Sequence, residues 1–277
     1  MQSYDPTRFL YLHADANAVG GRLQSPVEKF VPTHAPVSLP GVGGTTTANT
    51  EGFTFDDIVS CSAANTHVTS ADHKSDGSAT ILVTSVVKGL NILEVFSAER
   101  IVVQMTINVS GATGQITVVP LGSAYEGVKV AGYPCEVILA KGLQHLDRTP
   151  EGRTRSLTWS DVRNIGRAQA KALLSSVKSN REDDVYQWAE RKYGWVIPEP
   201  TGPGTAMCSI VESIETKAPV HVHGHIIEIP HFGRLSLGEL AVGPRRAQLT
   251  GVRADLGCVN AGAITACCGG GGSTGEN

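Results

Sequence analysis

Charged residues are scarce in this chain, and the two signs are nearly balanced. They make up 18% of the 277 residues, with 23 Lys and Arg against 26 Asp and Glu, so the net charge at pH 7 is −3. Because this balance attracts no polyanion globally, it argues against a general nucleic-acid binder or a protein held to an acidic membrane surface. The 41% of hydrophobic residues suffices for a core without disulfide staples.

Long apolar runs and metal-finger cysteine pairs are also missing. No stretch approaches the roughly 20 apolar residues of a membrane-spanning helix. The first residues include Asp5 and Arg8 and contain no apolar run of a secretory signal. The six cysteines show no C-x-x-C spacing. We therefore expect a soluble, cytoplasmic protein with reduced thiols and no membrane partner.

The common catalytic and nucleotide-binding motifs are absent as well. Neither a P-loop nor a Gly-x-Gly-x-x-Gly sequence occurs. Residues 271–275 match the spacing of a nucleophile elbow, but we do not expect the strand before it and the helix after it that this motif needs. Without a convergent nucleophile, a carboxylate pair or a cofactor signature, the sequence favours a non-enzymatic function.

The dominant positive signal is β-strand alternation. In residues 101–109, apolar side chains at 101, 103, 105, 107 and 109 share one face, while Gln104, Thr106 and Asn108 share the other. Residues 89–100 fit neither period and are interpreted as a strand bounded by turns. Further strands are predicted at 9–12, 81–87, 116–119, 128–139, 208–215, 220–229, 234–242 and 247–256. Short strands separated by turn signals predict a mainly β fold with antiparallel sandwich or barrel-like sheets.

A helical insertion is predicted around residues 160–194. Ser160 is a suitable N-cap for apolar residues at helical spacing from Val162 to Val177, and a second helix is predicted at 183–194. We expect a single β-rich domain over residues 1–277 with a helical insertion at 143–197 and a flexible Gly-rich tail at 269–277. Two β domains separated by the helices are the alternative.

Histidines are concentrated in the segment VHVHGHIIEIPHFG. In an extended strand His221, His223 and His225 would point to one face, and neighbours two residues apart could share a metal ion. Glu228 or His231 could supply a further ligand. The segment thus predicts a divalent-metal site formed by His221, His223, Glu228 and His231. The alternatives are a merely polar strand face and a pH-sensing contact, since imidazoles titrate near neutrality.

The spacing His221-x-His223-x4-Glu228 resembles part of the first metal motif of the cupin family. The resemblance implies a β-barrel that binds a metal ion such as iron, manganese or zinc. It covers fewer than ten residues. Glu215 and Leu235 stand where that motif has flanking glycines, and no later Pro-x-Gly-x-x-His follows.

A basic stripe follows the first predicted helix. Residues 141–178 carry eight basic residues against three acids, so this segment is +5 while the remainder is −8. Arg163, Arg167 and Lys171 lie on one side of the helix and are predicted to bind an anion. A solvated face and a contact with an acidic protein are the alternatives. A nucleic-acid ligand is disfavoured because no aromatic residues, which would stack on nucleobases, alternate with these basic residues.

The sequence as a whole favours a non-enzymatic assembly or binding module. Edge strands of such a fold pair readily with copies or partners, so we expect a homo-oligomer or a protein partner. A metal-dependent, cupin-like β-barrel enzyme that uses the His-rich strand is the first alternative. An anion or nucleic-acid binder that uses the basic helix face is the second.

Overall fold

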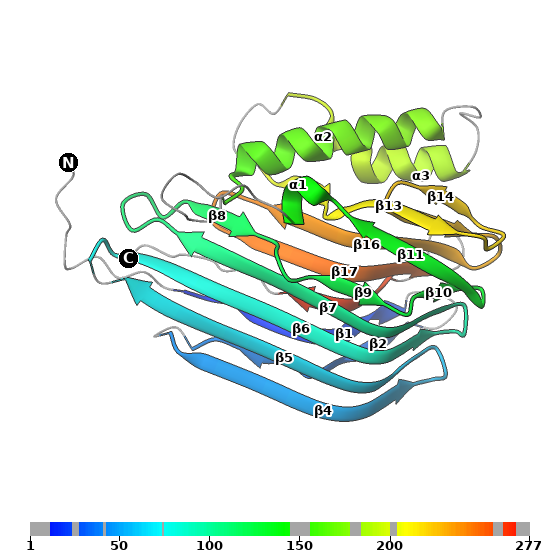
Figure 1. Ribbon diagram of the computed structural model, residues 1–277, viewed down its shortest axis with the longest axis horizontal. Coiled ribbons are helices and arrows are strands. Elements are labelled where there is room, and N and C mark those ends of the chain that lie inside the picture. The colour runs from blue at the N-terminus through cyan, green and yellow to red at the C-terminus, as the bar shows by residue number, and fades with distance from the viewer. Residues whose placement is uncertain are drawn as a thin grey trace.

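The computed structural model of this chain describes residues 12–23, 28–40, 43–73, 75–144, 156–177, 184–199, 204–256 and 263–269. Two β-sheets face one another, and helices lie over part of one of them (Figure 1). All the strand pairings between named strands are antiparallel. The prediction of a mainly β fold with antiparallel, sandwich-like sheets is therefore confirmed.

Sheet 1 joins strands from both ends of the chain. In spatial order it contains β14 (His221–His223), β15 (Ile226–Ile229), β16 (Gly233–Val242), β17 (Ala247–Leu256), β18 (Ala263–Gly269), β1 (Asp15–Leu23) and β2 (Lys29–His34). Two short strands lie off this path: β12 (Ala206–Ser209) pairs with β16, and β3 (Val37–Ser38) pairs with β1. The N-terminal strands thus complete a sheet that is built mainly by the C-terminal third.

Sheet 2 is built mainly from the middle of the chain. Its order is β13 (Val211–Thr216), β11 (Tyr133–Leu139), β10 (Lys129–Val130), β7 (Phe96–Val109), β6 (Ser78–Ile92), β5 (Val59–His73) and β4 (Thr45–Phe55). The short strands β8 (Ile116–Val119) and β9 (Ala124–Glu126) pair with β7. Among the described strands each sheet keeps two end strands, so the architecture is an open sandwich rather than a barrel.

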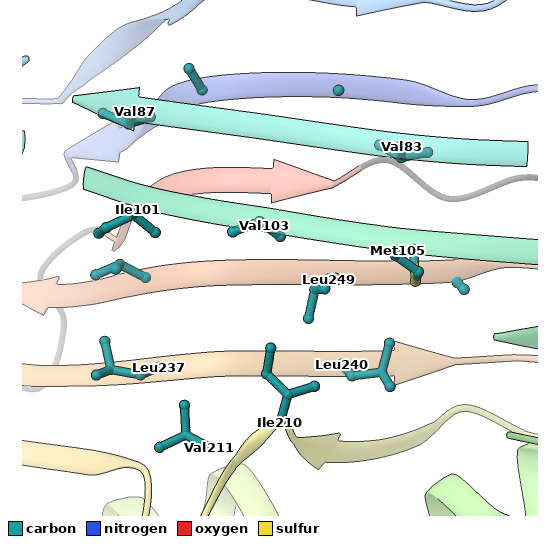
Figure 2. Packing of buried hydrophobic residues seen from close by; sticks show 14 of the residues in the cluster. Val83, Val87, Ile101, Val103, Met105, Ile210, Val211, Leu237, Leu240 and Leu249 are labelled. Carbon is teal, nitrogen blue, oxygen red and sulfur yellow. The ribbon is translucent and has the colours of Figure 1, made fainter. Parts of the chain in front are cut away.

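The core fills the space between the two sheets. Figure 2 shows side chains of sheet 2, such as Val103 and Met105, facing Leu240 and Leu249 of sheet 1. Met105, Leu240 and Leu249 are fully buried. The alternation predicted for residues 101–109 is confirmed, because the odd-numbered residues are buried and the even-numbered residues from 104 to 108 are partly exposed.

The ambiguous segment at 89–100 is the end of one strand, a turn and the start of the next. Along β6, burial passes from odd-numbered residues up to Val87 to even-numbered residues from Leu90 onward. The change occurs at Gly89, whose φ is +58°. A Cβ atom there would lie 2.7 Å from Ser62 Oγ on the neighbouring strand. The alternation is interrupted because the strand bends at Gly89, where the positive φ and the close neighbour favour glycine over residues with a side chain.

Helices cover the outer face of sheet 1, the face directed away from the core. They are α2 (Trp159–Ser176), α3 (Asp184–Tyr193) and the 3-10 turn η1 (Gly194–Val196), whereas the short α1 (Lys141–Gln144) follows β11 and buries Leu143 in the core. The N-cap of α2 is Thr158 rather than the predicted Ser160, because Thr158 forms a reciprocal capping box with Asp161. The buried side of α2, which includes Val162 and Leu173, faces the sheet, and α2 packs mainly on β12. None of the described helices is long and apolar enough to cross a bilayer.

Some strands differ from the sequence predictions, and some predicted segments lie outside the residues that the structure describes. The positions of β1, β2, β4, β5 and β18 were not predicted. Residues 220–229 form two strands instead of one, because the chain reverses at Gly224, whose φ is +61°. Residues 9–11 and 270–277, which include most of one predicted strand and of the predicted tail, lie outside the described residues.

Candidate functional site

The β14–β15 hairpin carries three of the four predicted metal ligands on its outer face. His221 lies directly opposite Glu228 across the hairpin, and His223 follows two residues further along β14. Glu228 is 3.6 Å from the Arg234 guanidinium. The fourth predicted ligand, His231, is exposed in the turn after β15 with a φ of +62°. Within the described residues, no group of three or more His, Cys, Asp or Glu side chains is placed to hold a metal ion.

His225 does not share the face of His221 and His223, as an extended strand would require. It occupies the hairpin turn and is 7% exposed. His223 instead lies 3.2 Å from the hydroxyl of Ser176, at the edge of a pocket of about 270 Å³ between α2 and the hairpin. Ser176 is the last residue of α2, and its hydroxyl donates to the Leu173 carbonyl. A helix C-terminus disfavours negative charge, so this serine–histidine pair is poorly placed for nucleophilic catalysis.

A buried polar cluster lies between α3 and sheet 1 and centres on Glu239 of β16. The Glu239 side chain is 5% exposed. Its carboxylate accepts a hydrogen bond of 2.8 Å from the Tyr193 hydroxyl and one of 2.7 Å from Arg253 Nε. Lys192 Nζ is 3.2 Å from the same carboxylate. Glu239 thus connects the helix to two neighbouring strands of the sheet.

The electrostatics of this cluster keep Glu239 charged and its neighbours neutral. Burial acts to raise the pKa of Glu239, but Lys192 and Arg253 outweigh it and lower that pKa to about 2. Burial raises the pKa of Tyr193 well above its ordinary value, and the nearby Glu239 charge adds to this effect. Burial lowers the pKa of His225 to about 4, against the upward pull of Glu239. At neutral pH the cluster therefore contains a charged carboxylate, a neutral phenol and a neutral imidazole.

These groups satisfy one another and leave little capacity for a substrate. His225 Nε2 is 3.2 Å from the Tyr193 hydroxyl, and Lys192 donates to Ser236 Oγ at 2.9 Å. Lys192 also lies 3.4 Å from Asp255. Sequence reasoning missed the cluster, although an acid within the apolar strand around Glu239 was a signal. We interpret the cluster as a structural contact that holds α3 against sheet 1.

The basic side of α2 is partly neutralised by the chain itself. Arg163 and Arg167 each form an ion pair with a different oxygen of the Glu199 carboxylate. The Arg163 guanidinium also lies 5.7 Å from the centre of the Trp159 ring. Lys171, the third predicted anion-binding residue, is exposed one turn further along α2. The structure therefore brings the two arginines together on one internal carboxylate.

A larger hollow of about 750 Å³ lies on the outer face of sheet 2, over β6 and β7. Its polar side chains form a chain of contacts with one another. His73 Nε2 is 3.2 Å from Thr80 Oγ1, which donates to Asn108, and Asn108 in turn donates to Ser156. These contacts run along the surface and do not converge on a single reacting point.

The buried cysteines do not supply a nucleophile. Cys61, Cys135 and Cys208 are free and buried. Burial raises the pKa of the Cys135 thiol to about 11 and that of Cys208 to about 12. Both thiols are neutral at pH 7 and therefore poorly reactive.

The β4 edge of sheet 2 is the longest end strand among the described ones. It runs for 11 residues, with the sequence TTTANTEGFTF. Its inner neighbour β5 pairs with it along almost its whole length, while no described strand pairs with its other edge (Figure 1). An edge of this kind presents a row of backbone donors and acceptors to a further strand.

The fold and these surfaces define an open two-sheet β-sandwich with a helical layer on one sheet. The chain belongs to the family described as "Domain of unknown function (DUF8256)", whose model matches residues 9–243. The match spans strands of both sheets and the helical layer. Comparison with curated proteins and with solved structures finds no match.

Proposed function

We propose that this protein is a non-enzymatic assembly module that associates with a second copy of itself through the β4 edge of sheet 2. The observation that carries the proposal is the composition of β4. The strand is long and contains no proline, lysine or arginine, and its single charge is Glu51. Natural sheets usually protect their edges with the very features that β4 lacks.

The other three end strands carry such protection. In sheet 1, β14 is only three residues long, and β2 contains Lys29 and Pro32. In sheet 2, β13 has six residues, of which Glu212 and Glu215 are exposed acids. Short length, charge and proline each oppose edge-to-edge pairing. The contrast between β4 and these three edges supports β4 as the surface that another strand covers.

Residues 45–51 of β4 are suited to pairing with themselves. In an antiparallel pair centred on Ala48 of both copies, Thr45 would face Glu51, and Thr47 would face Asn49. The one charged residue would then meet a threonine and not its own copy. Thr46 would face Thr50, and threonines opposite one another are favourable cross-strand pairs. This register joins sheet 2 of both molecules into one continuous sheet, which supports a second copy as the occupant.

A charge-swap experiment tests the proposal. Thr47→Lys combined with Asn49→Lys places lysines opposite lysines in the two-fold pair, so this variant should be monomeric in sedimentation velocity across a hundredfold concentration range in which the wild type dimerises. Thr47→Glu with Asn49→Glu should be monomeric for the same reason. Mixing the two variants should restore a heterodimer, because unlike charges then face each other.

The control is Gln248→Lys, which adds a lysine at an exposed strand position away from the edge. This variant should dimerise like the wild type. A wild type that remains monomeric at every concentration would refute the proposal. Dimers that persist in both charge variants would show that the copies meet elsewhere, which equally overturns the assignment to β4.

A further inference from the structure

Arg163 and Arg167 form a fixed two-guanidinium receptor on α2. They are one helical turn apart, and each contacts a different oxygen of Glu199. Arg163 is held against the Trp159 ring, and the Trp159 indole in turn donates to the Gly204 carbonyl at 2.8 Å. Arg163 is therefore positioned by the Trp159 ring as well as by the carboxylate.

The two sides of this contact differ in exposure. The Arg163 and Arg167 side chains are 14% and 30% exposed, whereas the Glu199 side chain is 67% exposed. A carboxylate that is largely in water can leave at low cost, since exposed ion pairs contribute little to stability. The arginines would then keep their places. In addition, Arg167 Nε is buried and has no hydrogen-bond partner, so the receptor retains a donor that Glu199 does not use.

The charge of the receptor exceeds that of its internal occupant. Arg163, Arg167 and Lys171 carry three positive charges along one side of α2, against the single negative charge of Glu199. The two arginines hold the pKa of Glu199 below its ordinary value, so this occupant is anionic at neutral pH. An oxyanion with two or more charges would match the site better than one carboxylate. Phosphate groups have this charge and accept bidentate bonds from arginine.

We propose that Arg163, Arg167 and Lys171 form a binding site for a phosphate-bearing small molecule and that the Glu199 carboxylate occupies this site in the free protein. The ligand competes with Glu199 for the two guanidiniums. Binding thus releases the segment that carries Glu199 from α2. This site is independent of the β4 edge, so the two proposals can fail separately.

The test uses inorganic pyrophosphate and isothermal titration calorimetry with the full chain. Glu199→Gln should bind pyrophosphate about two- to fivefold more tightly than the wild type, because the internal competitor loses its charge and an exposed ion pair competes only weakly. Adding Arg167→Gln to that variant should abolish the binding, while adding Lys171→Gln should weaken it several-fold. Affinity should fall as salt rises. The matched control is Glu190→Gln on α3, which removes an exposed carboxylate away from the arginines and should bind like the wild type.

A second measurement does not depend on any variant. In the wild type, the NMR signal of the Arg167 Nε–H group should shift on titration with pyrophosphate, while that of Arg100, which pairs with Glu126 on sheet 2, stays unchanged. If Glu199→Gln gains no affinity and the Arg167 signal does not move, the arginines only fix the segment that carries Glu199, and the proposal is wrong. Equal pyrophosphate affinity of the Glu199→Gln and Glu190→Gln variants would also overturn it.

Discussion

Glu239 offers the most quantitative test of how the helical layer is attached to the sheet. Glu239→Gln removes the negative charge that lies 3.2 Å from Lys192 and 2.7 Å from Arg253. Removing one partner of a buried ion pair typically costs about 3 to 5 kcal/mol, because the other charge stays uncompensated. Lys192 and Arg253 are 19% and 33% exposed and can regain some hydration. We therefore expect the lower end of that range, about 3 kcal/mol of unfolding free energy.

The pH dependence gives a second route to the same magnitude. The pKa of Glu239 is about 2 in the folded protein, against an ordinary value of 4.5. A carboxylate with a lowered pKa stabilises the fold above pH 4.5, and this contribution disappears as the pH falls toward 2. Each unit of pKa corresponds to about 1.4 kcal/mol, so the difference amounts to about 3 kcal/mol. Glu239→Gln should lose this part of the acid dependence.

Urea unfolding followed by circular dichroism at pH 7, 5 and 3 measures both effects. The gap between wild type and Glu239→Gln should be widest at pH 7 and should narrow at pH 3. Glu190→Gln, the exposed control on α3, should unfold like the wild type at each pH. A Glu239→Gln protein that loses less than about 0.5 kcal/mol at pH 7 would refute the interpretation of this cluster as a structural contact.

Three further perturbations test the packing. Burial lowers the pKa of His225 from 6.5 to about 4, so the unfolded chain binds the proton more readily and the unfolding free energy should fall between pH 6.5 and 4. His225→Phe should reduce this pH dependence in urea titrations, and an unchanged dependence would contradict a buried, neutral His225. Gly166→Ala would place a Cβ atom 1.7 Å from the Met207 carbonyl oxygen, so it should lose about 3 kcal/mol by thermal unfolding, whereas the exposed Ser175→Ala should be nearly neutral. Leu93 is 41% exposed with a φ of +50°, so Leu93→Asn should raise the unfolding free energy by up to about 1 kcal/mol, and a loss of stability would show that the leucine is needed.

Strand patterns were readable where one face is strongly apolar. Residues 101–109 alternate clearly because their odd-numbered side chains enter the core. The strands β4 and β5 were missed because their faces carry small and uncharged polar residues, such as Thr47, Asn65 and Thr66. Thr66 is fully buried, yet it satisfies its hydroxyl by donating to the Ala35 carbonyl. A hydrophobicity pattern cannot reveal a core-facing residue of this type.

The polar sites depended on contacts between distant parts of the chain. The helical stripe of Arg163 and Arg167 was visible in the sequence, but its partner Glu199 lies more than 30 residues away. Glu239 and Arg253 were visible only as single charges within apolar strands. For the histidines, local geometry decided the outcome, because the turn at Gly224 removes His225 from the face of the other two. Spacing along a sequence predicts shared faces only if the strand continues.

Self-association through β4 is tested most directly by amide hydrogen exchange at residues 45–51. Outward-facing amides of an open edge exchange rapidly, and pairing with a second copy protects them. We expect exchange in this segment to slow as protein concentration rises, while exchange in the interior strand β17 stays constant. Rapid exchange at residues 45–51 at every concentration, in a sample that sedimentation shows to be dimeric, would contradict it.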